Sequence, residues 1–185
     1  MSDDQIVMHC AATLRDRKAG SLFAAEYHDR QSLYKEIAEL NARLSSGNIR
    51  TMVLGFTKKR ALVYLYRPNR LAAALSDATA QKILQKSGYD TSHTGACLTR
   101  LIRRMKDTQN FPHEIGLFLG YPSCEVEAFI QNDRPCVFAG AWKVYCDAEY
   151  ARKCFRTFRD CTLTCRQKLS HGIPLEEMTI ERKED

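Results

Sequence analysis

Residues 111–130, FPHEIGLFLGYPSCEVEAFI, constrain the fold of this chain more than any other segment. A polar start that contains His113 and Glu114 leads into an apolar run at 115–119, and a Gly-Tyr-Pro break precedes a helical pattern. The run is too short to cross a membrane and has the length of a buried strand. We therefore expect a core strand at 115–119, with the two ionisable side chains held at its beginning.

Length and composition predict one globular domain. The chain has 185 residues, of which 44% are hydrophobic and 27% are charged. These values suffice for a single core without metal or disulfide support. We expect residues 1–174 to form this domain and the charged tail at 175–185 to fray. Asp3 and Asp4 argue against a secretion signal, and no run reaches the roughly 18 to 20 apolar residues of a membrane span. The protein is therefore expected to be cytoplasmic and to have no membrane partner.

Eight cysteines are spread along the chain, and no two of them have the Cys-x-x-Cys spacing of zinc or thioredoxin-type sites. In a reducing cytoplasm we expect them to be free thiols, most of them small core residues. They are Cys10, Cys97, Cys124, Cys136, Cys146, Cys154, Cys161 and Cys165.

Apolar periodicity and turn residues predict helices and strands that interleave without a repeated βαβ rhythm. The expected helices are 29–44, 69–75, 78–86, 94–106, 122–131 and 147–170. The expected strands are a hairpin at 51–56 and 61–66, the run at 115–119, and 136–145, with Gly140 as a bulge or close-approach point. The predicted class is α+β (mixed α/β), with a single layer of mixed sheet, about four strands including one hairpin, packed with helices.

Two pairs of neighbouring residues carry candidate chemistry. A thiolate near an imidazolium is a nucleophile, and cysteine with histidine can hold zinc or haem iron, so His9 and Cys10 are candidates. Because adjacent side chains point in different directions, Cys10 would need a partner such as His113 or His93. His113 beside Glu114 suits an acid, a base or a ligand. Each of these residues also suits a structural role, with His113 capping the strand entry and Cys10 packing in the core.

The net charge is +6, and basic residues gather at 100–106 and along the last predicted helix. Four arginines form a narrow stripe on that helix, at Arg152, Arg156, Arg159 and Arg166. The stripe is either a docking edge for an acidic protein partner or a solvated flank of the helix. Aromatic residues do not interleave with it, so nucleic acid is an unlikely partner and RNA binding is the weaker alternative.

Four segments resemble a bacterial family, found mainly in anaerobes, that is known as domain of unknown function 3793. They are HCAATL at 9–14, YRP at 66–68, FPHEIGLFLGYP at 111–122 and WKVY at 142–145. The chain departs from the family pattern at Ala12, where the pattern has proline, and at 123–126, where it has Pro-Glu-Asp-Val. The resemblance implies a bacterial, cytoplasmic protein and carries no activity with it.

These observations support two functional hypotheses and leave open whether the protein is an enzyme. In the first, the fold brings His9 and Cys10 toward His113 and Glu114, in a site for thiol chemistry or for binding a metal or haem. This hypothesis expects Cys10 to be partly exposed and within about 8 Å of His113. In the second, the protein is a non-catalytic adaptor that docks an acidic partner through its basic helix faces.

Overall fold

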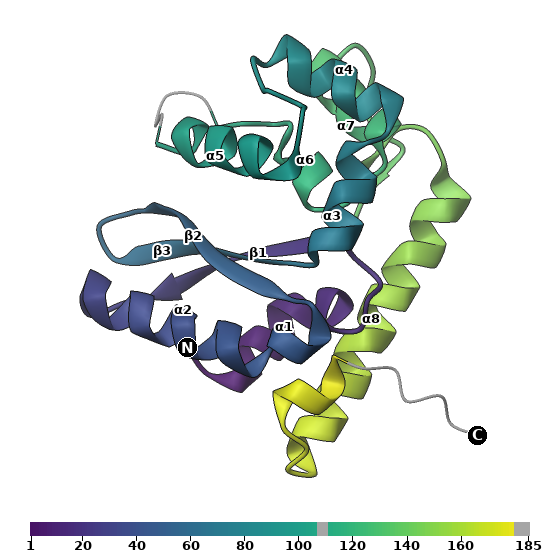
Figure 1. Ribbon diagram of the computed structural model, residues 1–185. Helices are drawn as coiled ribbons and strands as arrows, with labels where there is room; N and C mark the ends of the chain where they lie inside the picture. The colour runs from purple at the N-terminus through teal and green to yellow at the C-terminus, as the bar shows by residue number, and fades with distance from the viewer. Residues whose placement is uncertain (107–110, 180–185) are drawn as a thin grey trace. The chain divides into compact units, whose positions relative to one another are not determined.

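The computed structural model describes residues 1–106 and 111–179, and its helices and antiparallel sheets confirm the α+β class (Figure 1). The chain divides into two compact units. The first unit comprises Met1–Pro68 and Thr157–Asp185, and the second comprises Asn69–Arg156. The expectation of a single domain over residues 1–174 stays a prediction. Within the described ranges, no helix combines the length and apolar character needed to cross a membrane.

The first unit is built on a three-stranded antiparallel sheet with the strand order β1-β3-β2. The strands are β1 (Gly20–Glu26), β2 (Arg50–Phe56) and β3 (Arg60–Tyr66). Helices α1 (Asp3–Leu14) and α2 (Arg30–Arg43) lie on one face of the sheet, as Figure 1 shows. Short 3-10 turns, η1 (Ser45–Gly47) and η2 (Leu175–Met178), complete it. The hairpin β2–β3 and the helix at 29–44 confirm the predictions, whereas β1 was not predicted.

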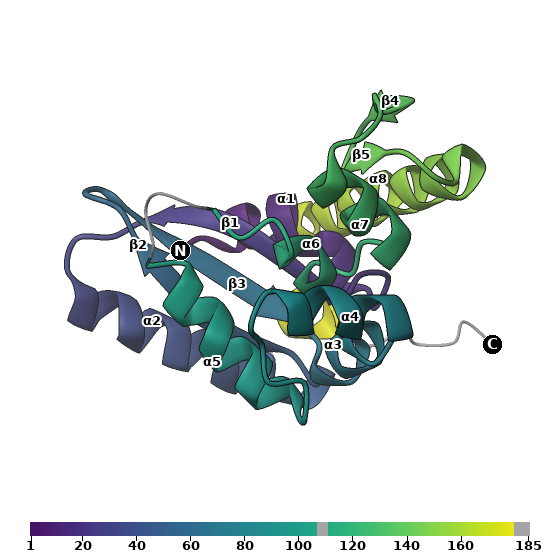
Figure 2. The same cartoon turned by 90° about the horizontal axis from the view of Figure 1, so that it is seen from above.

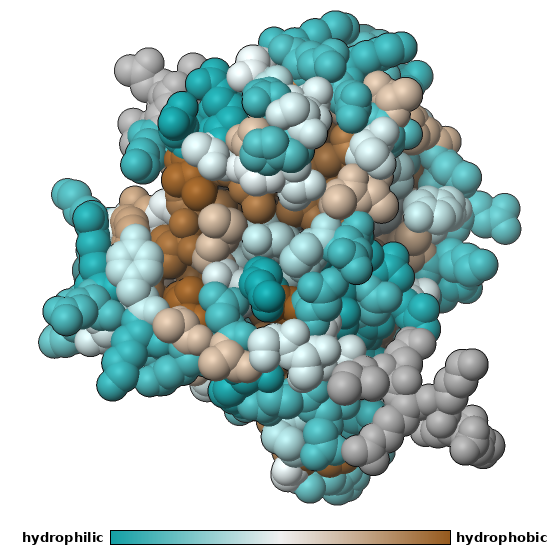
Figure 3. All heavy atoms as spheres, viewed as in Figure 1, coloured by the Kyte–Doolittle hydropathy of each residue, from teal (hydrophilic) through white to brown (hydrophobic). Residues whose placement is uncertain are grey.

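The core of the first unit lies between the sheet and the two helices. Phe23, Val63 and Leu65 of the sheet pack against apolar side chains such as Ile6 and Leu33 of the helices. Helix α2 buries only the three residues that recur at helical spacing, Leu33, Ile37 and Leu40. Its outward side is hydrophilic in Figure 3, as expected for an amphipathic helix on a surface.

Arg67 is a buried guanidinium that joins four separate carbonyl groups of the first unit. It donates to the oxygens of Thr13 at 2.7 Å and Leu14 at 2.5 Å, which end helix α1. It also donates to the oxygens of Gly47 at 2.8 Å and Thr179 at 3.0 Å. The last carbonyls of a helix have no partner within it, so Arg67 supplies the donors that α1 lacks.

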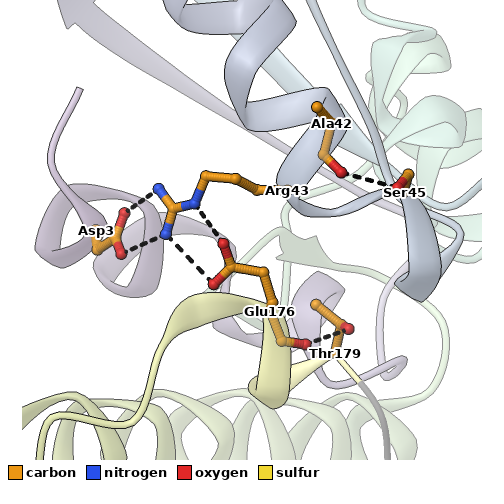
Figure 4. Close-up of polar contacts among 6 residues, drawn as sticks. All are labelled: Asp3, Ala42, Arg43, Ser45, Glu176 and Thr179. Carbon is orange, nitrogen blue, oxygen red and sulfur yellow. Dashed lines mark hydrogen bonds and ion pairs between the residues drawn. The ribbon is translucent and has the colours of Figure 1, made fainter.

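Arg43 ties the beginning and the end of the first unit together (Figure 4). Its guanidinium makes a two-pronged contact with Asp3 of α1, at 2.7 and 3.0 Å, and its Nε donates to Glu176 of η2 at 2.5 Å. The hydrogen bond from Arg43 lowers the pKa of Glu176 below its usual 4.5. The network therefore stabilises the docking of η2 only while Glu176 is ionised.

Acidification is expected to remove this contribution. A carboxyl group whose pKa is lowered by folding adds stability above its unfolded pKa, here 4.5, and this stability is lost as the pH falls through the folded value. Because Glu176 is partly exposed, we expect it to contribute only about 1 kcal/mol to the free energy of unfolding. The free energies of unfolding of the wild type and Glu176→Gln, measured with urea, should differ by this amount at about pH 6. The two values should become equal near about pH 3. A constant difference between the two proteins over that range would contradict the ion-pair assignment.

The second unit is mostly helical. Its helices are α3 (Pro68–Leu75), α4 (Ala78–Lys86), α5 (Thr94–Arg104), α6 (Ile115–Phe118), α7 (Ser123–Gln131) and the beginning of α8 (Ala148–Ser170), which continues into the first unit. A small hairpin of β4 (Phe138–Ala139) and β5 (Lys143–Val144) lies beside α7 (Figure 2). The bounds of α4 match the prediction, and those of α3, α5, α7 and α8 differ from it by one or two residues.

The predicted core strand at 115–119 is wrong, because these residues form the short helix α6. All four residues of α6 are buried, as predicted, so the helix has no exposed face. A short apolar run has no periodicity that separates a buried strand from a buried helical turn. Gly120, with a φ of 75°, then ends the turn, and Pro122 precedes the first residue of α7.

Three further details differ from the predictions. The sheet is not one mixed layer but two separate antiparallel sheets. Residues 136–145 form two short strands around a turn, in which Gly140 is a close-approach point, since a Cβ there would overlap the Phe155 ring. Residues 175–178 of the predicted tail form η2, and Leu175 and Met178 are buried in the first unit's core, while fraying of the tail stays a prediction. Residues 180–185 lie outside the described part of the chain.

Candidate functional site: an aromatic pocket in the second unit

An open pocket of about 350 Å³ lies wholly within the second unit. This volume falls in the usual range of small-molecule sites, about 300 to 1,000 Å³. Aromatic and aliphatic side chains make up most of its wall, with a few polar groups between them. The lining residues are Phe111, His113, Ile115, Gly116, Tyr121, Glu125, Val126, Phe129, Trp142 and Lys143.

Local sequence explains how α6, the turn after it and α7 form one wall of the pocket. Gly116 sits in α6, where a Cβ would come within 2.8 Å of Val126 and 3.2 Å of Tyr121. The Tyr121 N–H donates to the Gly116 oxygen at 2.9 Å, which folds the Gly-Tyr-Pro turn back onto α6. Helix α7 then presents Glu125, Val126 and Phe129, which share one face because Phe129 lies about one turn after the other two. The missing side chain at Gly116 therefore lets Val126 and Tyr121 pack closely against α6, and all three residues line the pocket.

Aromatic rings in the pocket wall hold one another in place. The Tyr121 and Trp142 ring centroids are 5.1 Å apart, and Phe155 supports Trp142 from behind at 4.5 Å in an edge-to-face contact. His113 meets Phe129 edge-on at 5.1 Å. Burial raises the pKa of Tyr121 to about 12, so its phenol stays protonated at neutral pH. The wall thus offers fixed aromatic surfaces, which favour flat apolar partners.

Glu125 fixes one side of the pocket rather than serving as an available charge. Its carboxylate is buried and accepts three backbone N–H bonds, from Tyr145 at 2.6 Å, Cys146 at 3.1 Å and Asp147 at 3.3 Å. These bonds attach the segment between β5 and α8 to helix α7. They also satisfy both carboxylate oxygens, so the acidic charge is balanced by backbone donors.

Apart from the Tyr121 phenol, which stays protonated, the remaining ionisable groups in the wall are basic. His113 and Lys143 are exposed on the pocket wall, and the Lys143 ammonium lies 5.3 Å from the centroid of the Phe129 ring. Since Glu125 is the one carboxylate in the wall and is already bound, the charge that a ligand would meet is positive.

The two residues of the predicted pair, His113 and Glu114, have different positions in the second unit. His113 lines the pocket, whereas Glu114 is buried and is not among the lining residues. The Glu114 carboxylate contacts Arg104 Nε at 2.6 Å and accepts from the Tyr89 hydroxyl at 2.8 Å. Burial, and next this hydrogen bond, raise the pKa of Tyr89. Glu114 therefore attaches the beginning of α6 to α5.

The predicted pair His9 and Cys10 lies in the first unit, so a site shared with His113 stays a prediction. The expectation that Cys10 is partly exposed is wrong, because the Cys10 side chain is completely buried in the core. Burial raises its pKa to about 12, although nearby Lys18 and a hydrogen bond with Ser21 lower it. The His9 ring stacks on Phe23, with 5.6 Å between centroids. Helix α1 directs its apolar side, which includes Cys10, into the sheet.

Cys10 is therefore expected to react slowly. At neutral pH, a thiol with a pKa of about 12 has almost no thiolate, which is the reactive form. Iodoacetamide should modify exposed Cys124 well before Cys10 in the folded protein, and Cys10 only after unfolding. Mass spectrometry of timed digests measures both rates. Equal labelling of the two residues under native conditions would contradict the burial of Cys10.

The arginine stripe on α8 is exposed at Arg152, Arg156, Arg159 and Arg166. Arg152 also lies over the Phe138 ring, 4.8 Å from its centroid. The first two arginines belong to the second unit and the others to the first. A docking edge for an acidic partner stays a prediction.

The four segments that resemble the known family meet in two pairs. In the first unit, Arg67 of YRP binds the carbonyls of Thr13 and Leu14 in HCAATL. In the second unit, residues of both FPHEIGLFLGYP and WKVY line the aromatic pocket. The first pair is structural, and the second forms a cavity.

Comparison with known proteins gives one match. The sequence model of a family described as "Protein of unknown function (DUF3793)" matches residues 6–179. The chain belongs to this family. No curated protein and no solved structure matches the chain. The matched residues include both pairs of segments. The family description assigns no activity to either pair.

Sequence reasoning identified His113 but missed the rings around it. The sequence spacing of the aromatic residues Tyr121, Phe129 and Trp142 does not distinguish them from ordinary core residues. Only the fold brings them together around a cavity. Among residues 1–106 and 111–179, no three His, Cys, Asp or Glu side chains gather into a metal-binding group. One usable signal was Gly116, a glycine inside a run of large apolar residues, which indicates close approach of neighbouring groups.

Proposed function

We propose that this protein binds a small, flat, mostly apolar anion in the aromatic pocket of its second unit. The observation that carries the proposal is the cavity of about 350 Å³ whose wall includes the rings of Phe111, Tyr121, Phe129 and Trp142. Aromatic faces and edges interact best with another flat ring, and burial of such a ring removes apolar surface from water. A ligand of one or two fused rings suits a cavity of this size.

The preference for an anion follows from the charges at the wall. Lys143 and His113 are exposed there, while both oxygens of Glu125 already accept backbone N–H bonds. A carboxylate or similar group at the mouth would remain close to solvent and near the Lys143 ammonium. A cationic ligand would instead meet a wall without an available carboxylate.

Binding without chemistry is the function these residues support. Cys10 is buried with a raised pKa, so thiol chemistry at that residue is not part of the proposal. The His113 imidazole remains the one candidate in the pocket for a proton transfer or for ligation of a metal or haem. A cytoplasmic location in a bacterium belongs to the proposal as well and rests on the family resemblance.

Trp142 is the only tryptophan of the chain, so its fluorescence reports on the pocket alone. Titration with naphthoate should quench its emission saturably, with a dissociation constant on the order of 10 to 100 µM. The neutral naphthamide should bind more weakly, and the naphthylmethylammonium cation more weakly again. Non-saturating quenching by all three compounds, or tightest binding of the cation, would contradict the proposal.

A matched pair of lysine variants tests the charge preference. Lys143→Gln should reduce the ratio of the dissociation constants of naphthamide and naphthoate at least severalfold. Lys86→Gln, on an exposed position of α4 in the same unit, should leave that difference unchanged. An equal effect of both variants would mean that net charge, and not the pocket, sets the preference.

A further inference from the structure

Two exposed cysteines, Cys124 and Cys146, meet beside the beginning of helix α7. Cys124 is the second residue of α7, and Cys146 lies in the segment between β5 and α8. The Cys124 thiol lies close enough to the Cys146 thiol to raise its pKa. The next residue, Glu125, accepts the Cys146 backbone N–H at 3.1 Å, so the two backbones are held together independently of the thiols. Both cysteines belong to the second unit.

This arrangement favours a bond between the sulfurs over a metal site. A structural zinc site needs four ligands, and within the described ranges no third His, Cys, Asp or Glu joins the pair to form a metal-binding group. The Arg134 guanidinium lies 3.9 Å from the Cys146 sulfur. A fixed positive charge there opposes a metal cation but stabilises a thiolate.

We propose that Cys124 and Cys146 form a reversible disulfide in exchange with a small-molecule disulfide such as oxidised glutathione. One thiol loses its proton and attacks the glutathione disulfide, which forms a mixed disulfide and releases one glutathione thiolate. The second cysteine thiolate then attacks the protein sulfur of the mixed disulfide and releases the other glutathione. The two cysteines lose two electrons and two protons, and oxidised glutathione becomes two reduced molecules.

The local environment sets the conditions for this exchange. Desolvation, and next the neighbouring Cys124 thiol, raise the pKa of Cys146 to about 11. Exchange should therefore accelerate as the pH rises, since thiolate is the attacking form. The bond would fasten α7 covalently to the segment that Glu125 already holds, next to the pocket. This proposal is independent of the ligand proposed above.

The test incubates the full chain with oxidised glutathione, alkylates the remaining thiols and maps the products by mass spectrometry. Trypsin cleaves after Lys143, and a protease specific for aspartate cleaves before Asp133. Together they separate Cys124, Cys136 and Cys146 into different peptides. The expected product is a cross-linked pair of the Cys124 and Cys146 peptides, lighter by two hydrogen atoms and reversed by dithiothreitol.

Single variants distinguish true exchange from accidental oxidation. Cys124→Ser should trap glutathione on Cys146, or Cys146→Ser on Cys124, because the resolving thiol is missing. Cys136→Ser is the matched control and should leave the cross-link unchanged. Cys136 is chosen because the β4–β5 pairing, if continued, would place it opposite Cys146. Trp142 fluorescence shows that each variant is folded. A Cys136–Cys146 product, or full alkylation of Cys124 and Cys146 after incubation, would overturn the proposal.

Discussion

Replacing Arg67 with alanine is expected to lower the free energy of unfolding by about 3 to 5 kcal/mol. The buried guanidinium donates to the carbonyls of Thr13, Leu14, Gly47 and Thr179. Its removal leaves several buried acceptors without their donor and opens a gap at the end of α1. Since whole domains are stable by only about 5 to 15 kcal/mol, this loss is large. Urea unfolding followed by circular dichroism measures it.

Two further variants show whether geometry or charge matters at Arg67. Arg67→Lys keeps the charge but lacks the planar fork, so it should still lose about 2 kcal/mol. Arg60→Ala removes an exposed arginine at the beginning of β3, the strand that Arg67 follows. This arginine is paired with Glu26 at 3.6 Å, and its removal should change stability by less than about 0.5 kcal/mol. If Arg67→Ala and Arg60→Ala cost the same, Arg67 does not support the end of α1.

Replacing Glu125 with alanine is expected to destabilise the second unit by about 2 to 4 kcal/mol. The carboxylate is the acceptor for the backbone N–H groups of Tyr145, Cys146 and Asp147. Without it, the segment before α8 should detach from α7, and the amide hydrogens of these three residues should exchange faster with solvent. Hydrogen exchange by mass spectrometry locates the effect, and Trp142 emission should shift to longer wavelength as the pocket opens.

The matched variants for Glu125 separate its acceptor role from its charge. Glu125→Gln keeps one acceptor oxygen and should lose about half as much stability. Glu127→Ala removes a carboxylate two residues later on the same helix, to which no backbone N–H among residues 1–106 and 111–179 donates, and should be nearly neutral. Unchanged exchange at residues 145–147 in Glu125→Ala would contradict the role assigned to the carboxylate.

The elements that could be predicted are those whose own residues determine them. The helix at 78–86 has a cap at Asp77 and a glycine after its end, and the hairpin at 51–66 has two apolar strands around a polar turn. Strand β1 could not be found in this way, because GSLFAAE has little strand character and is held by pairing with β3. The turn at 115–118 depends on burial on all sides, which no local pattern reports.

The candidate site was less predictable than the fold. Sequence reasoning selected ionisable residues, and the fold places Cys10 in the core and Glu114 in an ion pair with Arg104. Only His113 lies in the pocket. Most of the other pocket residues are aromatic or aliphatic, and their function depends on an empty space that forms when α6, α7 and the β5 segment meet. Such a space has no signature in spacing or charge.

Calorimetric titration of two phenylalanine variants with naphthoate tests the aromatic pocket most directly. Phe129 lines the pocket, whereas Phe138 lies in the same unit and contacts Phe155 outside it. The account predicts one binding site in the wild type, at least a tenfold weaker affinity in Phe129→Ala, and an affinity within about twofold of the wild type in Phe138→Ala. Absence of saturable heat in the folded wild type, or equal weakening in both variants, would contradict it.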